Sequence, residues 1–220
     1  MGDTLHLLAQ WTPFLAGGFF WNIVISLAAM SIGTAFGAWL AWLRVAPRRR
    51  VARTCDAVAE IMRDTPTIVF QFYLAFILPT EITLPGIDTV IPFPTWIKAA
   101  LALSVAVGAF VSDNLGPLFR CKSTHLRSRL LSFLPHWSTY FVVIVIASSG
   151  ASVIGVDELV SRCNSVVNAV GRTQVMLWVY LYAMLWFFLF CYGLNRVIKL
   201  LGSAADSRVG SAMAQPDVEA

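Results

Sequence analysis

The stretch FFWNIVISLAAMSIGTAFGAWLAWL (Phe19–Leu43) contains no charged residue over its 25 positions. A helix of about 20 apolar residues crosses the hydrocarbon core of a bilayer, which is about 30 Å thick. Lipid offers the backbone no hydrogen-bond partner, so an isolated segment of this kind has to be helical. The stretch therefore predicts a transmembrane helix.

Four further apolar segments follow in a chain of 220 residues that is 58% hydrophobic and only 13% charged. A soluble domain needs more charge on its surface than this. We predict an all-α, polytopic integral membrane protein with one transmembrane domain over residues 1–201 and a disordered tail over 202–220. The five predicted spans cover about residues 19–43, 58–78, 96–115, 134–154 and 175–198.

The connections between the spans alternate in charge. Arg44–Arg53 contains five arginines, Thr80–Pro94 contains two acids and no base, and Arg120–Arg129 contains four bases. Basic connections stay on the cytoplasmic side of a membrane. We therefore expect the N-terminus outside and the C-terminus in the cytoplasm, and we interpret the net charge of +4 as a topology signal rather than a nucleic-acid site.

Motifs of catalysis and metal binding are missing from the sequence. It has no GxxxxGK[ST] loop for a nucleotide, no HExxH and no GxSxG. Its four cysteines form no CxxC pair, so no metal site is predicted. We expect no catalytic residue and no enzymatic activity in this chain.

Small residues recur every four positions in the first predicted span, at Ala29, Gly33 and Gly37. This spacing places them on one helix face, where they allow a second helix to approach closely. We predict that this face packs against another helix.

Polar residues inside the predicted spans are candidates for a substrate pathway, because charge in a bilayer is costly and tends to face a partner or a cavity. Gln71 lies seven residues after Asp64, on the same face of a continuous helix. The candidate pathway residues are Asp64, Gln71, Asp113, Ser148 and Ser149. Two alternatives stay open: Glu60, Arg63 and Asp64 as an interfacial ion-pair cluster, and the serines as donors to their own helix backbone.

Three stretches resemble the permease subunits of polar amino acid ABC importers, the histidine, glutamine and arginine type. The first, Gly18–Arg44, is similar to the first span of that family. The second, VAEIMRDTPTIVFQFYLAFILP (Val58–Pro79), resembles the pattern E-L-F-R-G-T-P-L-L-V-Q, and the third, SSGASVIGVDEL (Ser148–Leu159), is close to S-S-L-A-S-V-I-G-V-D-E-L. In the second stretch Asp64 replaces the usual glycine, and the residues that match are Glu60, Arg63, Thr65, Pro66 and Gln71.

The resemblance implies a multi-pass subunit of a bacterial inner membrane importer. Such permeases form a pore from two subunits, as homo- or heterodimers, above two cytoplasmic ATPase subunits. They receive their substrate from an external solute-binding protein. ATP would then be used by the partner ATPase, with no cofactor bound to this chain.

Two departures from the family pattern bear on coupling and on substrate contacts. The cytoplasmic E-A-A signature that docks in the ATPase is missing, and a short basic stretch stands in its place. Its bases, the candidate ATPase-facing residues, are Arg120, Lys122, Arg127 and Arg129, with a simple orientation signal as the alternative. In the fourth span, Ile146-Ala147 and Thr139-Tyr140 stand where the family carries Lys-Asp and Asn-Glu.

We therefore expect a degenerate half of a heterodimer, whose partner subunit supplies most substrate contacts. The alternative is a structural or regulatory membrane subunit derived from a permease, without transport of its own. A secondary transporter is disfavoured, because the five predicted spans show no internal repeat.

Overall fold

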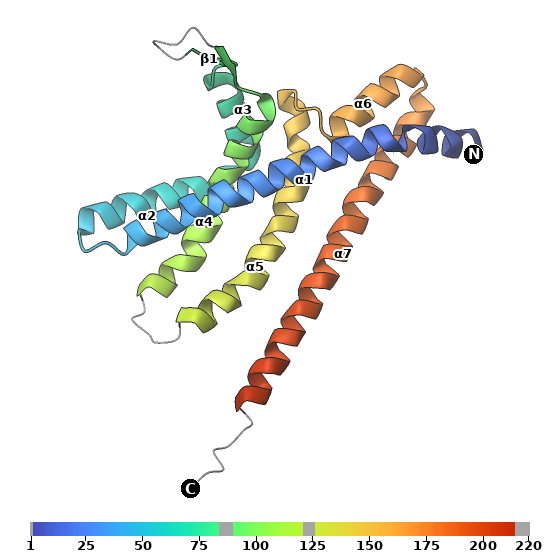
Figure 1. Ribbon diagram of the computed structural model, residues 1–220. Coiled ribbons are helices and arrows are strands. Elements are labelled where there is room, and N and C mark those ends of the chain that lie inside the picture. Colours follow the sequence, from blue (N-terminus) through green and yellow to red (C-terminus); the bar gives the residue numbers. More distant parts are fainter. Residues whose placement is uncertain (1, 84–89, 121–125, 214–220) are drawn as a thin grey trace.

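The computed structural model describes the backbone of residues 2–83, 90–120 and 126–213 (Figure 1). It is helical apart from one short hairpin, in which β1 (Glu81–Thr83) pairs antiparallel with β2 (Val90–Pro92). A 3-10 helix, η1 (Ser148–Ile154), continues α5. The α-helices are α1 (Gly2–Arg44), α2 (Arg49–Asp64), α3 (Thr67–Ile77), α4 (Thr95–Arg120), α5 (Leu126–Ala147), α6 (Leu159–Val170) and α7 (Thr173–Met213).

Four helical stretches of the described chain are long and apolar enough to cross a bilayer: His6–Arg44, Thr95–Phe119, Phe133–Ile154 and Thr173–Leu200. They contain the predicted first, third, fourth and fifth spans. A helix of this length and composition is stable in lipid because all of its backbone hydrogen bonds are internal. The chain is therefore a multi-pass membrane protein.

The region of the predicted second span, residues 58–78, is not one continuous helix in the structure. The structure divides this region into α2 and α3 at Thr65 and Pro66, where Thr65 adopts an extended conformation with φ −86° and ψ 125°. Proline lacks an N–H and disfavours helical conformation in the residue before it, which explains the break. The apolar part, α3, has 11 residues and is too short to cross a bilayer alone.

Two further boundaries differ from the sequence prediction. Helix α7 continues to Met213, inside the tail that we predicted to be disordered from residue 202, and residues 214–220 lie outside the described residues. The fourth connection contains α6, which begins after Glu158, whose side chain accepts a hydrogen bond from the Ser161 N–H. It ends at Gly171, whose φ of 65° is a left-handed conformation that glycine adopts readily.

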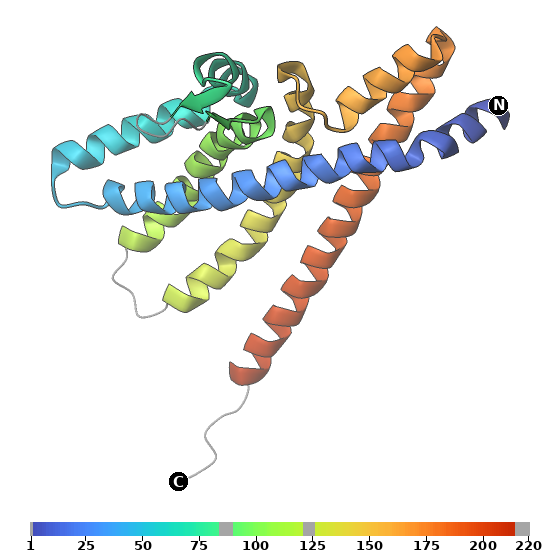
Figure 2. The ribbon, with the colours of Figure 1, turned by 45° about the horizontal axis from the view of Figure 1, so that its top comes forward.

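Helix α1 crosses the other long helices and packs most extensively on α4 (Figures 1 and 2). The two helices approach closely at Gly33 and Gly37. A Cβ atom at Gly37 would lie 2.5 Å from the Gly108 carbonyl oxygen and 2.8 Å from the Val111 Cβ. Ala29 is fully buried in the apolar cluster that α1 forms with α4. The small-residue face identified in the sequence is thus the face that α1 presents to α4.

A second apolar cluster joins the N-terminal half of α1 to α6 and α7. Phe19 contacts the rings of Trp186, Phe187 and Phe190 at centroid distances of 5.4 to 5.7 Å. The α1–α2 corner, the C-terminal end of α4, the N-terminal end of α5 and the C-terminal end of α7 lie toward one side of the molecule, away from α6 and β1 (Figure 1).

Adding a methyl group at the α1–α4 contact tests this packing. We expect Gly37→Ala to lower the free energy of unfolding by about 1–3 kcal/mol, because two backbones must move apart. Gly193→Ala is the control: a Cβ at Gly193 meets no atom within 4 Å, and alanine favours a helix over glycine by up to about 1 kcal/mol. Thermal unfolding in detergent, monitored by size-exclusion chromatography, measures the change in stability of each variant. Equal changes for the two variants would contradict the close contact.

Candidate functional site

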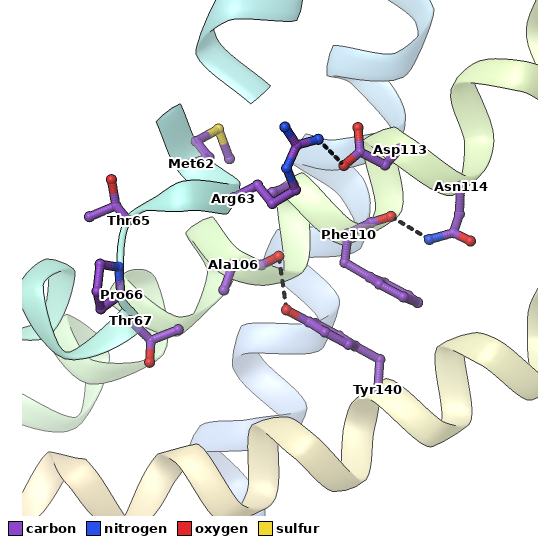
Figure 3. Close-up of a pocket in the computed structure, with 11 residues that line it drawn as sticks. Met62, Arg63, Thr65, Pro66, Thr67, Ala106, Phe110, Asp113, Asn114 and Tyr140 are labelled. Carbon is purple, nitrogen blue, oxygen red and sulfur yellow. Dashed lines mark hydrogen bonds and ion pairs between the residues drawn. The ribbon is translucent and has the colours of Figure 1, made fainter. Parts of the chain in front are cut away.

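A cavity of about 400 Å³ lies where the break between α2 and α3 faces α4 and α5 (Figure 3). The lining residues come from α2, the break, α3, α4 and α5: Met62, Arg63, Thr65, Pro66, Thr67, Ala106, Ala109, Phe110, Asp113, Asn114 and Tyr140.

One wall of the cavity is charged. The two carboxylate oxygens of Asp113 accept from two arginines, Arg44 Nη1 at 2.8 Å and Arg63 Nη1 at 3.3 Å. Arg44 also contacts the Asp56 carboxylate at 2.6 Å and donates to the Ser112 hydroxyl at 2.9 Å. Asp113 therefore joins α1, α2 and α4, and the Arg44 side chain that it pairs with is only 16% exposed. Charge-assisted hydrogen bonds of this kind are stronger than neutral ones.

The wall across from Arg63 is aromatic. The rings of Phe110 and Tyr140 stack in parallel with a centroid distance of 3.9 Å. The Tyr140 hydroxyl donates to the Ala106 carbonyl oxygen, and the Asn114 amide donates to the Phe110 carbonyl oxygen (Figure 3). These hydrogen bonds fix the side chains of Tyr140 and Asn114. A cavity with one guanidinium, threonine hydroxyls and an aromatic wall is suited to bind a small polar solute.

The predicted pathway residues do not form one site. Of the five, only Asp113 lines the cavity. Asp64 lies beside it and pairs with Arg63 at 3.2 Å, so Arg63 and Asp64 belong to an ion-pair cluster with Asp113. Gln71, Ser148 and Ser149 are absent from the lining of this cavity.

Gln71 packs instead against η1. Its side chain is 1% exposed, and a Cβ atom at Gly150 would lie 2.9 Å from its Oε1 atom. The Gln71 Nε2 atom has no hydrogen-bond partner among the described residues. Ser148 and Ser149 donate to the carbonyl oxygens of Val145 and Ile146, each at 2.7 Å, which is the backbone bonding left open as the alternative.

A buried polar network that sequence reasoning missed lies at the start of α6. The Asn22 amide donates to the Ser148 hydroxyl at 3.0 Å and to the Glu158 carboxylate at 2.9 Å, and its oxygen accepts from the Leu159 N–H at 3.1 Å. All of these groups are buried. Two features of the sequence indicate it: Asn22 within the charge-free stretch Phe19–Leu43, and Glu158 within SSGASVIGVDEL.

Lys98 is a second residue that sequence reasoning missed. It lies in the first turn of α4 and is 2% exposed. Its ammonium donates to the carbonyl oxygens of Leu78 at 2.7 Å and Ala75 at 3.3 Å, at the C-terminal end of α3. A cation at this end of a helix satisfies free carbonyl groups and interacts favourably with the helix dipole.

The candidate ATPase-facing residues lie around the connection between α4 and α5. Arg120 ends α4, and Arg127 and Arg129 lie in the first turn of α5, but their side chains are outside the described part of the structure. Lys122 lies outside the described residues altogether. Only residues 121–125 separate the two helices.

The chain is similar in sequence to a curated permease and in fold to a solved transporter, and no family model matches it. It is 29% identical over 101 residues to a probable amino-acid ABC transporter permease protein, y4tG, of Sinorhizobium fredii (strain NBRC 101917 / NGR234). This match spans 46% of the chain and 40% of the relative's length. The crystal structure of an amino acid ABC transporter with histidines superposes with a TM-score of 0.74 at 16% identity, over 88% of this chain and 95% of that one.

The chain has the fold of an amino acid ABC transporter chain. The resemblance drawn from the three sequence stretches is confirmed by both comparisons, which reached amino acid ABC transporters by sequence and by fold. The permease-like fold also agrees with the predicted helical, membrane-spanning class.

Asp113 is the residue on which the charged wall of this permease-like fold depends. We expect Asp113→Asn to lower the free energy of unfolding by about 1–3 kcal/mol, because Arg44 and Arg63 lose their shared anion. Asp64→Asn, which removes only an exposed contact to Arg63, should change it by less than about 0.5 kcal/mol. Thermal unfolding of the purified variants in detergent distinguishes the two, and an equal effect would show that Asp113 has no special role.

Glu158 predicts a pH dependence. Burial raises the pKa of its carboxyl above the ordinary value of 4.5, and the hydrogen bond from Asn22 partly opposes this. The folded state then binds the proton more tightly than the unfolded state, so stability should fall as the pH rises from about 4.5 through the raised pKa. Glu158→Gln should flatten this dependence of stability on pH. The melting temperatures of variant and wild type, measured from pH 4.5 to 8, should therefore differ by an amount that changes with pH. Parallel curves would contradict the prediction.

Proposed function

We propose that this chain is the membrane-spanning permease subunit of an ATP-driven importer of polar amino acids in a bacterial inner membrane. The observation that carries the proposal is the fold, shared over 88% of the chain with an amino acid ABC transporter. The sequence similarity to a probable amino-acid permease and the four apolar spans agree with it.

The proposed orientation has the N-terminus outside and the C-terminus in the cytoplasm. The arginine-rich α1–α2 corner and the ends of α4 and α5 lie toward the same side of the fold (Figure 1). Positive charge of this kind is retained in the cytoplasm. ATPase subunits would bind on that side and use the ATP, and an external solute-binding protein would deliver substrate on the other.

The cavity beside the α2–α3 break is the proposed contact site for substrate. A volume of about 400 Å³ is ample for one amino acid. Its carboxylate would bind Nη2 of the Arg63 guanidinium, whose Nε and Nη1 contact Asp64 and Asp113. Asp113 is already paired with two arginines, so it offers little to a substrate ammonium group. A second permease subunit would supply that contact, consistent with the uncharged Thr139-Tyr140 and Ile146-Ala147 in the fourth span.

Transport requires two packings of these helices, one open to each side, and ATP binding has to favour one of them. The extended backbone at Thr65 and Pro66 is the place in the described chain where α3 can change its angle to α2 without breaking a helix.

Purification from native membranes followed by reconstitution in vesicles tests the function. We expect an ATPase and a second permease subunit to co-purify, and the vesicles to take up a labelled polar amino acid only with ATP and a binding protein. Arg63→Gln should lower uptake about tenfold, a loss of about 1.4 kcal/mol, and Arg63→Lys should lower it less. Arg172→Gln, at an exposed position outside the cavity, is the control.

The alternative of a structural or regulatory subunit is favoured by one observation, the short connection between α4 and α5 at residues 121–125. If the ATPase and partner transport equally well without this chain, the alternative holds. An active transporter in which this chain is the only permease would contradict the heterodimer.

A further inference from the structure

A cluster of unpaired positive charge lies at the corner where α1 ends and α2 begins. All four of its guanidinium groups are exposed, and none has an ion pair within the described residues. The first turn of α2 contains no acid, and Asp56, the next acid along the helix, is held by Arg44. These residues, the corner arginines, are Arg48, Arg49, Arg50 and Arg53.

One face of α2 continues from the corner arginines into exposed apolar surface. Arg50, Thr54, Val58 and Ile61 recur at intervals of four, four and three residues, so they share one helix face. Ile61 is 64% exposed and Val58 is 39% exposed. The packed face of α2 is a different one, centred on the buried Ala59. The free face therefore has a cationic end and an apolar end, as a phospholipid has a phosphate and an acyl chain.

Two tryptophans place the corner at the edge of the bilayer. Trp39 and Trp42 lie in the last turns of the apolar span His6–Arg44 and are 55% and 64% exposed. Indole side chains favour the interface between the hydrocarbon core and water. The corner arginines follow directly and therefore lie at the level of the lipid headgroups.

We propose that the corner arginines and the free face of α2 bind an anionic phospholipid. The guanidinium groups hold the headgroup phosphate through paired N–H donors, and Val58 and Ile61 contact the first part of an acyl chain. An acidic surface of a partner protein would satisfy the arginines but would leave the exposed apolar stripe beside them without a match. The proposal rests on the membrane embedding of the chain and not on its transport function.

Native mass spectrometry of the purified chain in detergent tests the proposal. The chain is titrated with phosphatidylglycerol and with phosphatidylcholine of the same acyl composition. We expect tighter retention of phosphatidylglycerol. Its affinity should fall about 25-fold in Arg49→Gln/Arg50→Gln, from about fivefold per arginine. Affinity for phosphatidylcholine should stay unchanged in that variant.

Two matched variants control for charge and for general effects. Arg49→Lys/Arg50→Lys keeps the charge and should retain most of the preference, whereas Arg172→Gln should retain all of it. The glutamine double variant leaves Arg44, Arg48 and Arg53 in place as the orientation signal. Equal affinities for the two lipids in the wild type, or an unchanged preference in the glutamine variant, would overturn the proposal. It would also be overturned if that variant lost a co-purifying protein and kept its lipid preference.

Discussion

The close approach of α1 and α4 at Gly33 and Gly37 positions the rest of the fold. Helices in lipid gain little from the hydrophobic effect when they associate, so they depend on tight packing and on hydrogen bonds between them. At Gly37 the α1 backbone lies against the Gly108 carbonyl of α4, with no side chain between them. Two turns later, this proximity brings Arg44 within hydrogen-bond distance of Ser112 and Asp113. The charged wall of the cavity therefore depends on two glycines, which have no side chain to hold α1 and α4 apart.

Polar networks hold α1 at two places, near its middle and at its C-terminal end. Asn22 binds Ser148 and Glu158, which ties α1 to η1 and to the start of α6. Arg44 binds Asp113 and Asp56, which ties it to α4 and α2. A satisfied polar network in a medium of low dielectric constant is strong, and an unsatisfied one is costly. Between these two networks, α1 packs on α4 at Gly33 and Gly37, and its Thr34 hydroxyl accepts a hydrogen bond from the Trp137 indole of α5 at 2.8 Å.

The spans were predictable because a charge-free run such as Phe19–Leu43 has few stable alternatives in lipid. The break at Pro66 carried a local signal, the proline itself, but the apolar residues after it have the length of a span only if α2 and α3 are joined. The same helix break separates two of the predicted pathway residues. Asp64 and Gln71 share a face only on a continuous helix, and the extended residue between them turns Gln71 toward η1.

The aromatic wall of the cavity was not predictable in the same way. Phe110 and Tyr140 lie in apolar spans, where an aromatic side chain ordinarily faces lipid or a neighbouring helix, and only tertiary packing stacks them. Asp113 was predictable because a lone acid near the end of a span has to find a partner. Its two arginines come from separate helices, and no spacing within the sequence relates them.

The buried ammonium of Lys98 couples α3 to α4. It fastens the last turn of α3 to the first turn of α4 through the carbonyl groups of Leu78 and Ala75. Because the group is shielded from water, neither salt nor competing solvent loosens it readily. The C-terminal end of α3 is thus fastened to α4, which is itself packed on α1. A change of the angle between α2 and α3 at Pro66 would therefore have to shift α4 along α1 or break the hydrogen bonds of Lys98.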